Sequence, residues 1–347
     1  MAPLLEAKNV RKVYTKGTRF LSKRSENVAL DNFSLTIGDD TPVFITIAGE
    51  SGSGKTTLAQ MLLGFTKPTS GQILYRGQDI QKMNVQNQKS FRHEVQAVFQ
   101  DPFAVYNPFY KVDHILQTPV RKFNLASSRA EAEIKILEAL SAVGLRPEDT
   151  LGRYPHQLSG GQRQRITVAR TLLMRPKLVI ADEPVSMVDA SLRATILESM
   201  YKVHKEFGIS FLYITHDLTT AYQVSNSIVI LYRGIVAEAG DVEEVIKNPQ
   251  HPYTQELVGS IPLPNPGSQW MDDGPGIEAV ENTMHKVTVG CKYATRCPHV
   301  MDRCRQVMPP LYQQSAGRAA ACYLYDQSPE LVREQLADVL YAQSETE

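Results

Sequence analysis

The chain has 347 residues, enough for two compact domains of ~150 residues each, and its 42% hydrophobic content is typical of a globular protein with a sizeable core. The 37 Lys and Arg balance the 37 Asp and Glu, so the composition argues against a nucleic-acid partner held by bulk charge. No run of about 18 apolar residues predicts a membrane span. Residues 1–10 lack the basic-then-apolar pattern of a secretory signal, so we expect a cytoplasmic protein.

The first 260 residues alternate short apolar runs with amphipathic stretches, which predicts an α/β fold with a mostly parallel sheet. In chain order, strands are expected at 43–48, 178–181, 210–214 and 228–232. A helix is expected at 56–63, with Gly64 as its stop. Helical periodicity dominates from about 101 to 176, which indicates a helical subdomain inserted into the sheet domain.

A phosphate-binding loop is expected between the first of these strands and its helix. The GxxxxGK[ST] motif is formed by Gly49, Glu50, Ser51, Gly52, Ser53, Gly54, Lys55 and Thr56. Its backbone N–H groups and the helix N-terminus would hold phosphates, together with the next helix residue, Thr57. Lys55 is expected to reach the β and γ phosphates, and the Thr56 hydroxyl to bind Mg²⁺. The alternative is a glycine-rich turn with a chance lysine, which the flanking strand and helix disfavour.

Two carboxylates, Asp182 and Glu183, end the apolar run at 178–181. At a strand end beside the phosphate loop, Asp182 could enter the Mg²⁺ shell and Glu183 could accept a proton from water in line with the γ phosphate. The alternative is an ordinary strand followed by a charged loop.

A second anion-binding helix start is expected at the sequence LSGGQ, residues 158–162. Ser159, Gly160, Gly161 and Gln162 precede a helix that should run to about residue 175. One chain with two such helix starts suggests nucleotides shared across a dimer.

With these motifs in order over about residues 4–260, the sequence resembles the ATPase subunits of ABC (ATP-binding cassette) transporters. The resemblance implies that Tyr14 stacks on adenine and that Gln100 touches Mg²⁺ and the lytic water. It implies that the LSGGQ residues close over ATP of the opposite subunit, that Asp189 lies at the dimer seam and that His216 holds the γ phosphate. Tyr14 could instead be a surface tyrosine, and His216 a packed histidine at a strand end. The segment 186–189 reads Ser-Met-Val-Asp where Ser-Ala-Leu-Asp is commoner, which changes only apolar packing.

Several segments are similar to the oligopeptide/dipeptide importer subfamily: Tyr-Pro-His-Gln at 154–157, Asp-Pro-Phe-Ala-Val-Tyr-Asn-Pro at 101–108 and His-Pro-Tyr-Thr at 251–254. The resemblance implies a peripheral subunit on the cytoplasmic face of the cell membrane. Its expected partners are a second, non-identical ABC ATPase, two transmembrane permease subunits and, indirectly, an extracellular solute-binding protein. The solute could be a peptide, an oligosaccharide or nickel. The segment 103–110 is expected to meet the permease, unless its rings pack internally.

We expect the ATPase domain to span residues 1–260, and a linker with a small cysteine-containing extension to span 261–347. The linker at 261–276 holds four prolines and three glycines in sixteen residues. All four cysteines follow it: Cys291, Cys297, Cys304 and Cys322. They could hold an iron–sulfur cluster, hold Zn²⁺ or stay as free thiols. The Cys-x₅-Cys-Pro pattern resembles the extension of some peptide-importer ATPases that bind a [4Fe–4S] cluster.

The sequence therefore predicts an ATP-hydrolysing subunit of an importer, with ATP, Mg²⁺ and a [4Fe–4S] cluster as cofactors. The alternative is a soluble ABC ATPase with a regulatory iron–sulfur unit that is not tied to transport.

Overall fold

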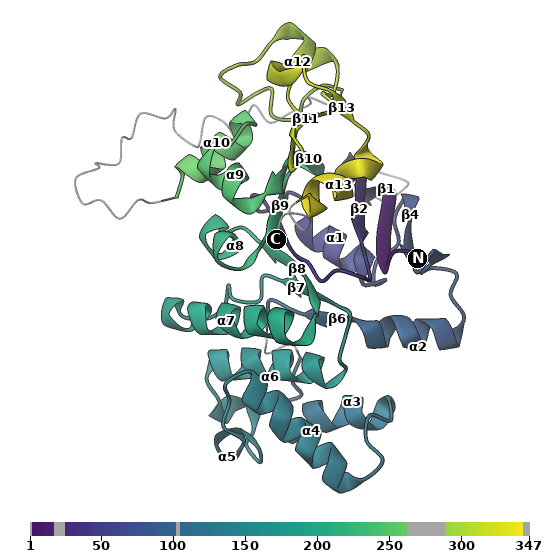
Figure 1. Ribbon diagram of the computed structural model, residues 1–347, viewed down its shortest axis with the longest axis vertical. Helices are drawn as coiled ribbons and strands as arrows, with labels where there is room; N and C mark the ends of the chain where they lie inside the picture. Colours follow the sequence, from purple (N-terminus) through teal and green to yellow (C-terminus); the bar gives the residue numbers. More distant parts are fainter. Residues whose placement is uncertain (1, 17–24, 102–104, 262–288, 343–347) are drawn as a thin grey trace, which may run out of the picture.

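The protein is described by a computed structural model that places residues 2–16, 25–101, 105–261 and 289–342. Two sheets form its framework: one of nine strands in the order β13-β11-β12-β10-β9-β3-β8-β7-β6, and one of four strands in the order β2-β1-β4-β5 (Figure 1).

Five parallel strands form the middle and one end of the larger sheet. They are β9 (Ser227–Tyr232), β3 (Phe44–Ala48), β8 (Ser210–Thr215), β7 (Leu178–Asp182) and β6 (Val95–Val98). Every residue of β3, β8 and β9 is buried, because helices or the second sheet cover both faces. The four strands expected from the sequence are confirmed to within one residue at each end.

Antiparallel strands extend this sheet beyond β9. They are β10 (Ile235–Asp241), β12 (Arg318–Ala320), β11 (Leu311–Ser315) and β13 (Glu330–Leu331). The parallel arrangement expected from the sequence therefore describes the centre of the sheet and not its whole width. Strand β12 pairs directly with β10, so residues of the C-terminal extension continue the ATPase sheet. The division of the chain at residue 260 stays a prediction.

The smaller sheet is antiparallel and was not expected from the sequence. It contains β2 (Ser25–Ile37), β1 (Leu5–Lys16), β4 (Ser70–Tyr75) and β5 (Gln78–Asp79). Helix α1 (Lys55–Leu62) contacts both this sheet and the central strands. Apolar side chains of both sheets, of α1 and of α13 (Leu336–Tyr341) form one continuous core.

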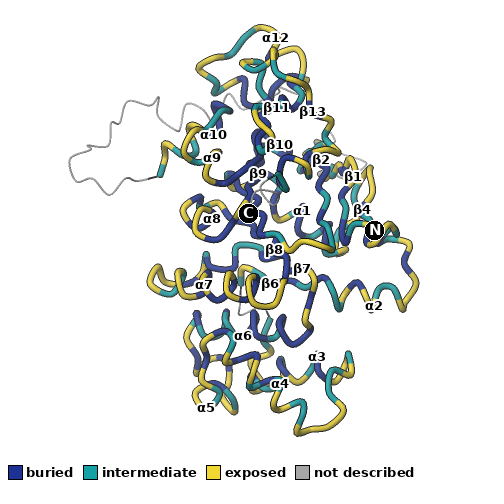
Figure 2. Tube along the Cα trace, in the orientation of Figure 1, coloured by how far each residue is buried: buried dark blue, intermediate teal, exposed yellow. Residues whose placement is uncertain are grey.

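The segment for which helices were expected is largely helical. It contains α3 (Asp113–Lys122), α4 (Arg129–Ala142), α5 (Pro147–Thr150), a 3₁₀ turn (Pro155–Gln157) and α6 (Gly160–Leu173). These helices lie together at the lower end of the molecule in Figure 1, where α7 (Ala190–Phe207) lies between α6 and the labels of the central strands. Helix α6 nevertheless contacts the end strand β6 directly. Helix α2 (Val85–Glu94) precedes β6 at the side of the molecule. Figure 2 shows that α4 and α7 are buried on one side and exposed on the other.

A third group of short helices shares an apolar cluster with β9 and β10 that is separate from the core containing α1. It contains α8 (Leu218–Val224), α9 (Val242–Lys247), α10 (Pro252–Gly259) and α12 (Asp302–Gln306). Two 3₁₀ turns, Tyr323–Tyr325 and Arg333–Gln335, flank β13. None of the helices in the described part of the chain has the length and apolarity needed to cross a membrane.

Candidate functional site

The loop between β3 and α1 has a backbone path that only glycine can follow at two points. Gly49 and Gly54 have φ of 146° and 106°. A Cβ at Gly49 would lie 2.1 Å from the carbonyl oxygen of Leu231, and one at Gly54 would lie 2.3 Å from that of Ala29. Both contacts are with backbone, which cannot move aside. The glycines of the motif therefore fix the loop against the neighbouring strands.

Lys55, the first residue of α1, turns back over this loop. Its Nζ donates to the carbonyl oxygens of Gly49 at 2.6 Å and Glu50 at 2.9 Å. The side chain is buried, and burial lowers the pKa of Lys55, while the nearby carboxylates of Glu183, Asp182 and Glu50 oppose that shift. An ammonium group held over a loop of this kind is suited to bind a polyphosphate.

Four adjacent parallel strands bring the polar residues of the site to one edge of the sheet. Thr56 lies in the helix that follows β3, and Asp182 ends β7. The hydroxyl of Thr56 donates to Asp182 Oδ1 at 3.4 Å. Gln100 follows β6, and its Nε2 donates to Glu183 Oε2 at 3.0 Å. His216 follows β8, and its Nδ1 lies 3.1 Å from Glu183 Oε1. The carboxyl ends of parallel strands are where such folds bind ligands.

Glu183 has a backbone conformation that is uncommon for its residue type. Its φ is 46°, in the left-handed region. Its N–H donates to the carbonyl oxygen of Ile214 in β8 at 2.9 Å, and Gln100 and His216 contact its two carboxylate oxygens. Residues held in such conformations are concentrated at functional sites. Burial raises the pKa of the neighbouring Asp182, and the Thr56 hydroxyl and the Lys55 ammonium oppose that shift.

The LSGGQ residues form a capped helix start. The Ser159 hydroxyl accepts from the N–H of Gln162 at 3.2 Å, and the Gln162 side chain accepts from the N–H of Ser159 at 2.9 Å. A Cβ at Gly161 would lie 2.8 Å from Leu192 in α7, and one at Gly160 would meet the carbonyl oxygen of Met187 at 3.9 Å. The helix start therefore packs against the segment that leads to Asp189 and α7. The expected end of this helix near residue 175 is two residues too late, because α6 ends at Leu173.

The remaining expected site residues are in strand β1, in the phosphate loop and in helix α1. Tyr14 is in β1 and is 37% exposed, and the ammonium of Lys12 lies 5.0 Å from its ring centroid. Ser51 and Gly52 are exposed and Ser53 is buried. Thr57 is the third residue of α1. The roles given to all these residues stay predictions.

The four cysteines lie together although the first and the last, Cys291 and Cys322, are 31 positions apart in sequence. All four line one small cavity. Cys291 and Cys304 are buried, and the N–H of Cys291 donates to the carbonyl oxygen of Cys304 at 2.7 Å. Burial raises the pKa of Cys291 and of Cys322 to about 11, so these thiols are protonated at neutral pH in the absence of a ligand. The described residues include no group of three or more His, Cys, Asp or Glu arranged around a single metal ion.

Sequence reasoning missed two residues that contact the phosphate loop. Tyr253 in α10 and Arg296, which follows the linker, both bond to Glu50. Arg296 lies 246 positions from Glu50, and no local pattern in the sequence indicates this pairing.

Comparison with known proteins agrees with this geometry. Residues 30–186 match the ABC transporter family, and residues 237–304 match the C-terminal region of oligopeptide/dipeptide transporters. The chain is 36% identical over 326 residues to the oligopeptide transport ATP-binding protein AppF of Bacillus subtilis, covering 93% of this chain and 97% of that protein. It is 36% identical over 325 residues to the dipeptide transport ATP-binding protein DppF of Escherichia coli, covering 94% and 95%.

Solved structures agree as well. The dimeric post-hydrolysis state of the ATP-binding cassette MJ0796 bound to ADP and Pi matches with a TM-score of 0.60 and 28% identity, over 69% of this chain and 98% of that one. CbiO1 of Clostridium perfringens matches with a TM-score of 0.60 and 26% identity, over 72% and 92%. Together these findings show that the chain belongs to the ATP-binding subunits of ABC transporters, in the oligopeptide/dipeptide group.

Proposed function

We propose that this chain binds and hydrolyses ATP at the β3–α1 loop to energise the import of peptides through a membrane permease. ABC subunits of this group are ATPases coupled to transport, and the curated relatives are named for oligopeptide and dipeptide transport. The observation that carries the proposal is the convergence of Gln100, Glu183 and His216 beside Thr56 and Asp182.

Each residue of this group has a distinct proposed task. Lys55 and the loop amides would bind the β and γ phosphates. Glu183 would take a proton from the attacking water, with Gln100 orienting that water and His216 contacting the γ phosphate. The hydroxyl of Thr56, the carboxylate of Asp182 and the amide oxygen of Gln100 are hard oxygen donors of the kind Mg²⁺ prefers, and the bound ion would neutralise charge on the phosphates. Tyr14 would stack on the adenine ring.

ATP would also join two subunits. The capped helix start at Ser159, with Gly160, Gly161 and Gln162, offers backbone N–H groups to a second phosphate chain. We propose that it closes over ATP held by the partner's loop, with Asp189 at the seam. ATP would then shift the pair toward the closed arrangement because it binds that arrangement more tightly. The partner would be a second, non-identical ATPase.

The partner proposals are tested by tagging the chain and purifying it from solubilised membranes. Mass spectrometry should recover two multi-spanning proteins and a second ATPase chain. Recovery of the tagged ATPase alone with the permeases would refute the non-identical pair. Recovery from the aqueous fraction without any permease would refute the peripheral membrane location and the transport role. Uptake of labelled dipeptide, maltooligosaccharide and Ni²⁺ would then be compared between a strain that lacks this chain and its parent. The solute whose uptake is lost in the deletion strain is the one that the importer carries, and we expect it to be the dipeptide.

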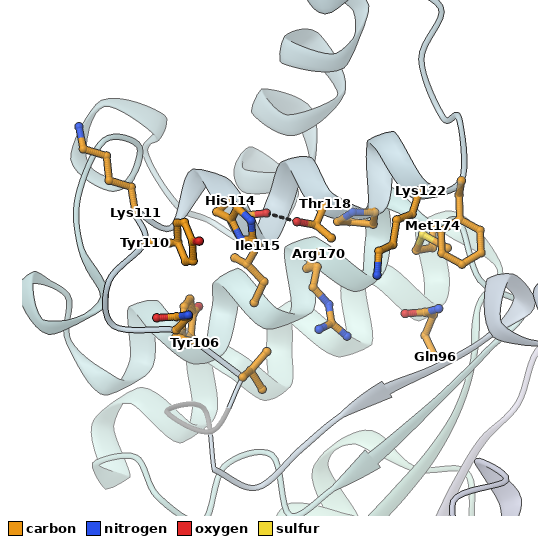
Figure 3. Close-up of a pocket in the computed structure, with 14 residues that line it drawn as sticks. Gln96, Tyr106, Tyr110, Lys111, His114, Ile115, Thr118, Lys122, Arg170 and Met174 are labelled. Carbon is orange, nitrogen blue, oxygen red and sulfur yellow. Dashed lines mark hydrogen bonds between the residues drawn. The ribbon is translucent and has the colours of Figure 1, made fainter.

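A groove beside the helical subdomain is the proposed contact with the permease. It has a volume of about 380 Å³ and lies between the β6 side of the sheet, α3 and α6 (Figure 3). Its basic residues are Lys111, His114, Lys122 and Arg170, and none of the described residues that line it is acidic. An acidic cytoplasmic segment of a permease would fit this charge. Residues 103 and 104 of the expected contact lie outside the described residues.

The aromatic residues of segment 103–110 were expected either to meet the permease or to pack internally, and the described ones include both kinds. The hydroxyl of Tyr106 donates to the carbonyl oxygen of Arg163 at 2.8 Å, so this side chain packs internally. Phe109 is 86% exposed and Tyr110 is 51% exposed with its ring 4.5 Å from that of His114. The two exposed rings are available to a partner.

Neighbouring positions of α3 provide a matched test of this contact. Thr118 lines the basic groove, whereas Gln117 lines a different groove between α3 and α4. Replacing Thr118 by the photoreactive residue benzoylphenylalanine should give a permease cross-link in membranes, and the same change at Gln117 should not. Equal cross-linking at both positions, or none at Thr118, would place the contact elsewhere.

We propose that the four cysteines of this chain hold a [4Fe–4S] cluster. The support is that Cys291, Cys297, Cys304 and Cys322 line one cavity, and thiolates are the usual ligands of such clusters. Protein purified without oxygen should contain iron and sulfide and absorb visible light, and Cys291→Ser should lose these signals. Wild-type protein without iron or sulfide would refute the cluster, and stoichiometric zinc would identify the alternative metal.

A further inference from the structure

The C-terminal extension contacts the phosphate loop through Glu50. The two Nη atoms of Arg296 donate to the two carboxylate oxygens of Glu50, each at 3.2 Å. The N–H of the same glutamate donates to the hydroxyl of Tyr253 at 2.9 Å. One residue of the loop is thus held at both its side chain and its backbone by residues that lie outside the sequence motif.

Arg296 is itself held in a fixed position. Its guanidinium also bonds to Glu256 in α10, and the hydroxyl of Tyr293 donates to that same carboxylate. The guanidinium carbon lies 5.6 Å from the ring centroid of Tyr293, a cation–π distance. The side chain of Arg296 is only 22% exposed. A planar guanidinium fixed on three sides is preorganised to orient a carboxylate.

Aromatic packing continues this support to the central sheet. The ring of Tyr253 lies 4.4 Å from that of Tyr232 in β9 and 5.7 Å from that of Tyr293. All three side chains are buried. The arginine, the tyrosines and β9 therefore form one packed unit beneath the loop.

The charge of Glu50 explains why this support matters. Its carboxylate lies in a loop built to bind phosphates, and it is one of the negative charges that act on Lys55. An unpaired carboxylate there would repel the phosphates and compete for the lysine. Arg296 neutralises that charge and holds the Glu50 carboxylate toward the extension.

We propose that Arg296, with Tyr253, is a positioning residue for ATP binding, acting through Glu50. The inference rests on the nucleotide site proposed above. It assigns to the extension a direct part in that site, independent of what the cysteines hold.

A double-substitution cycle tests the pair. A fluorescent ATP analogue is titrated with Mg²⁺ into the full-length chain. Because Arg296 and Glu50 are partly exposed, Arg296→Gln should weaken binding about fivefold. In the Glu50→Gln background the same change should alter binding less than about twofold, because there is no carboxylate left to neutralise. In ATPase assays of the assembled importer, Arg296→Gln should raise KM and leave kcat nearly unchanged.

Arg303→Gln is the matched control, because it removes an ion pair with Asp326 at 2.6 Å within the extension and away from the loop. It should not change binding. An equal effect of Arg296→Gln in both backgrounds would overturn the proposal and show that Arg296 supports only the fold of the extension. No effect in either background would overturn it as well.

A conservative variant covers the case in which Arg296→Gln does not fold. Arg296→Lys keeps the charge and loses the two-pronged geometry, so its affinity should lie between those of wild type and the charge-removing Arg296→Glu. Restoration of Arg296→Glu by Glu50→Arg would support the direct pair, and failure to restore it would count against the pair. If wild-type protein fails to bind the analogue, or if Lys55→Ala binds it normally, the nucleotide site itself is wrong. Those results are distinct from failure of the cycle.

Discussion

A buried ion pair joins the extension to the ATPase sheet, and its removal should loosen the strands that it connects. Glu238 in β10 is 0% exposed and Arg318 in β12 is 6% exposed, with Arg318 Nη2 3.0 Å and Nε 3.2 Å from Glu238 Oε1. The carboxylate also accepts the backbone N–H groups of Gln250 and His251. Arg318→Met would leave it buried with those amide donors alone.

The loss of stability in Arg318→Met depends on how many hydrogen-bond donors the Glu238 carboxylate keeps. Removing one partner of a buried pair costs about 3–5 kcal/mol, and the amides that stay place this case near 3 kcal/mol. If the loss falls on local opening of β12, its amides should exchange hydrogen about a hundredfold faster, because each 1.4 kcal/mol is a factor of ten. The backbone N–H of Ala321, which donates to the carbonyl oxygen of Ala237 at 2.8 Å, is a direct reporter.

Hydrogen exchange followed by mass spectrometry measures this change peptide by peptide. Peptides from β3 and β8 should keep their protection, whereas those covering β12 should lose it. Arg303→Met is the control, because its pair with Asp326 has side chains 43% and 38% exposed, and a solvent-screened pair should contribute little to stability. Unchanged exchange in β12 of Arg318→Met, or an equal change in the control, would refute the argument that burial makes this pair important.

Three further predictions concern the site and the core. Glu183→Gln should lower ATP turnover at least about a hundredfold while ATP still binds. Glu206→Gln, at an exposed position of α7, should change neither turnover nor binding, and normal turnover of Glu183→Gln would show that Glu183 is not the base. Tyr14→Ala should weaken ATP binding by about 1 kcal/mol through lost stacking, measured by titration; unchanged affinity would contradict its role. Burial lowers the pKa of His204 below its ordinary 6.5, so the unfolded chain binds this proton more readily and stability should fall as the pH drops below about 6.5. Thermal unfolding of His204→Gln should show a smaller drop between pH 7.5 and 5.5 than wild type, and an identical drop would refute the assignment.

Local patterns in the sequence were sufficient for the centre of the fold. The apolar runs that became β3, β7, β8 and β9 are bounded by turn residues and carry their signal within a few positions. The phosphate loop was found in the same way, because its glycines are needed at fixed offsets from Lys55.

Contacts between distant segments had no such signal. The sheet formed by β1, β2 and β4 was missed because β4 pairs with β1 across 70 positions, Leu5 with Tyr75, and because β1 has several register shifts that interrupt its alternation. The pairs Arg296–Glu50 and Arg318–Glu238 join residues 246 and 80 positions apart. A charged residue in isolation looks the same whether its partner is water or a distant carboxylate, so only the folded structure could identify these pairs.

The pairing of β12 with β10 has a consequence for handling the protein. β10 is almost wholly buried, with β9 on one side and β12 on the other. If the chain were cut at residue 260, one side of β10 would carry unpaired backbone donors and acceptors. Such an edge recruits strands from other molecules. The extension thus acts as a built-in cover against self-association, and the shortened ATPase would be expected to precipitate rather than behave as a smaller version of the whole.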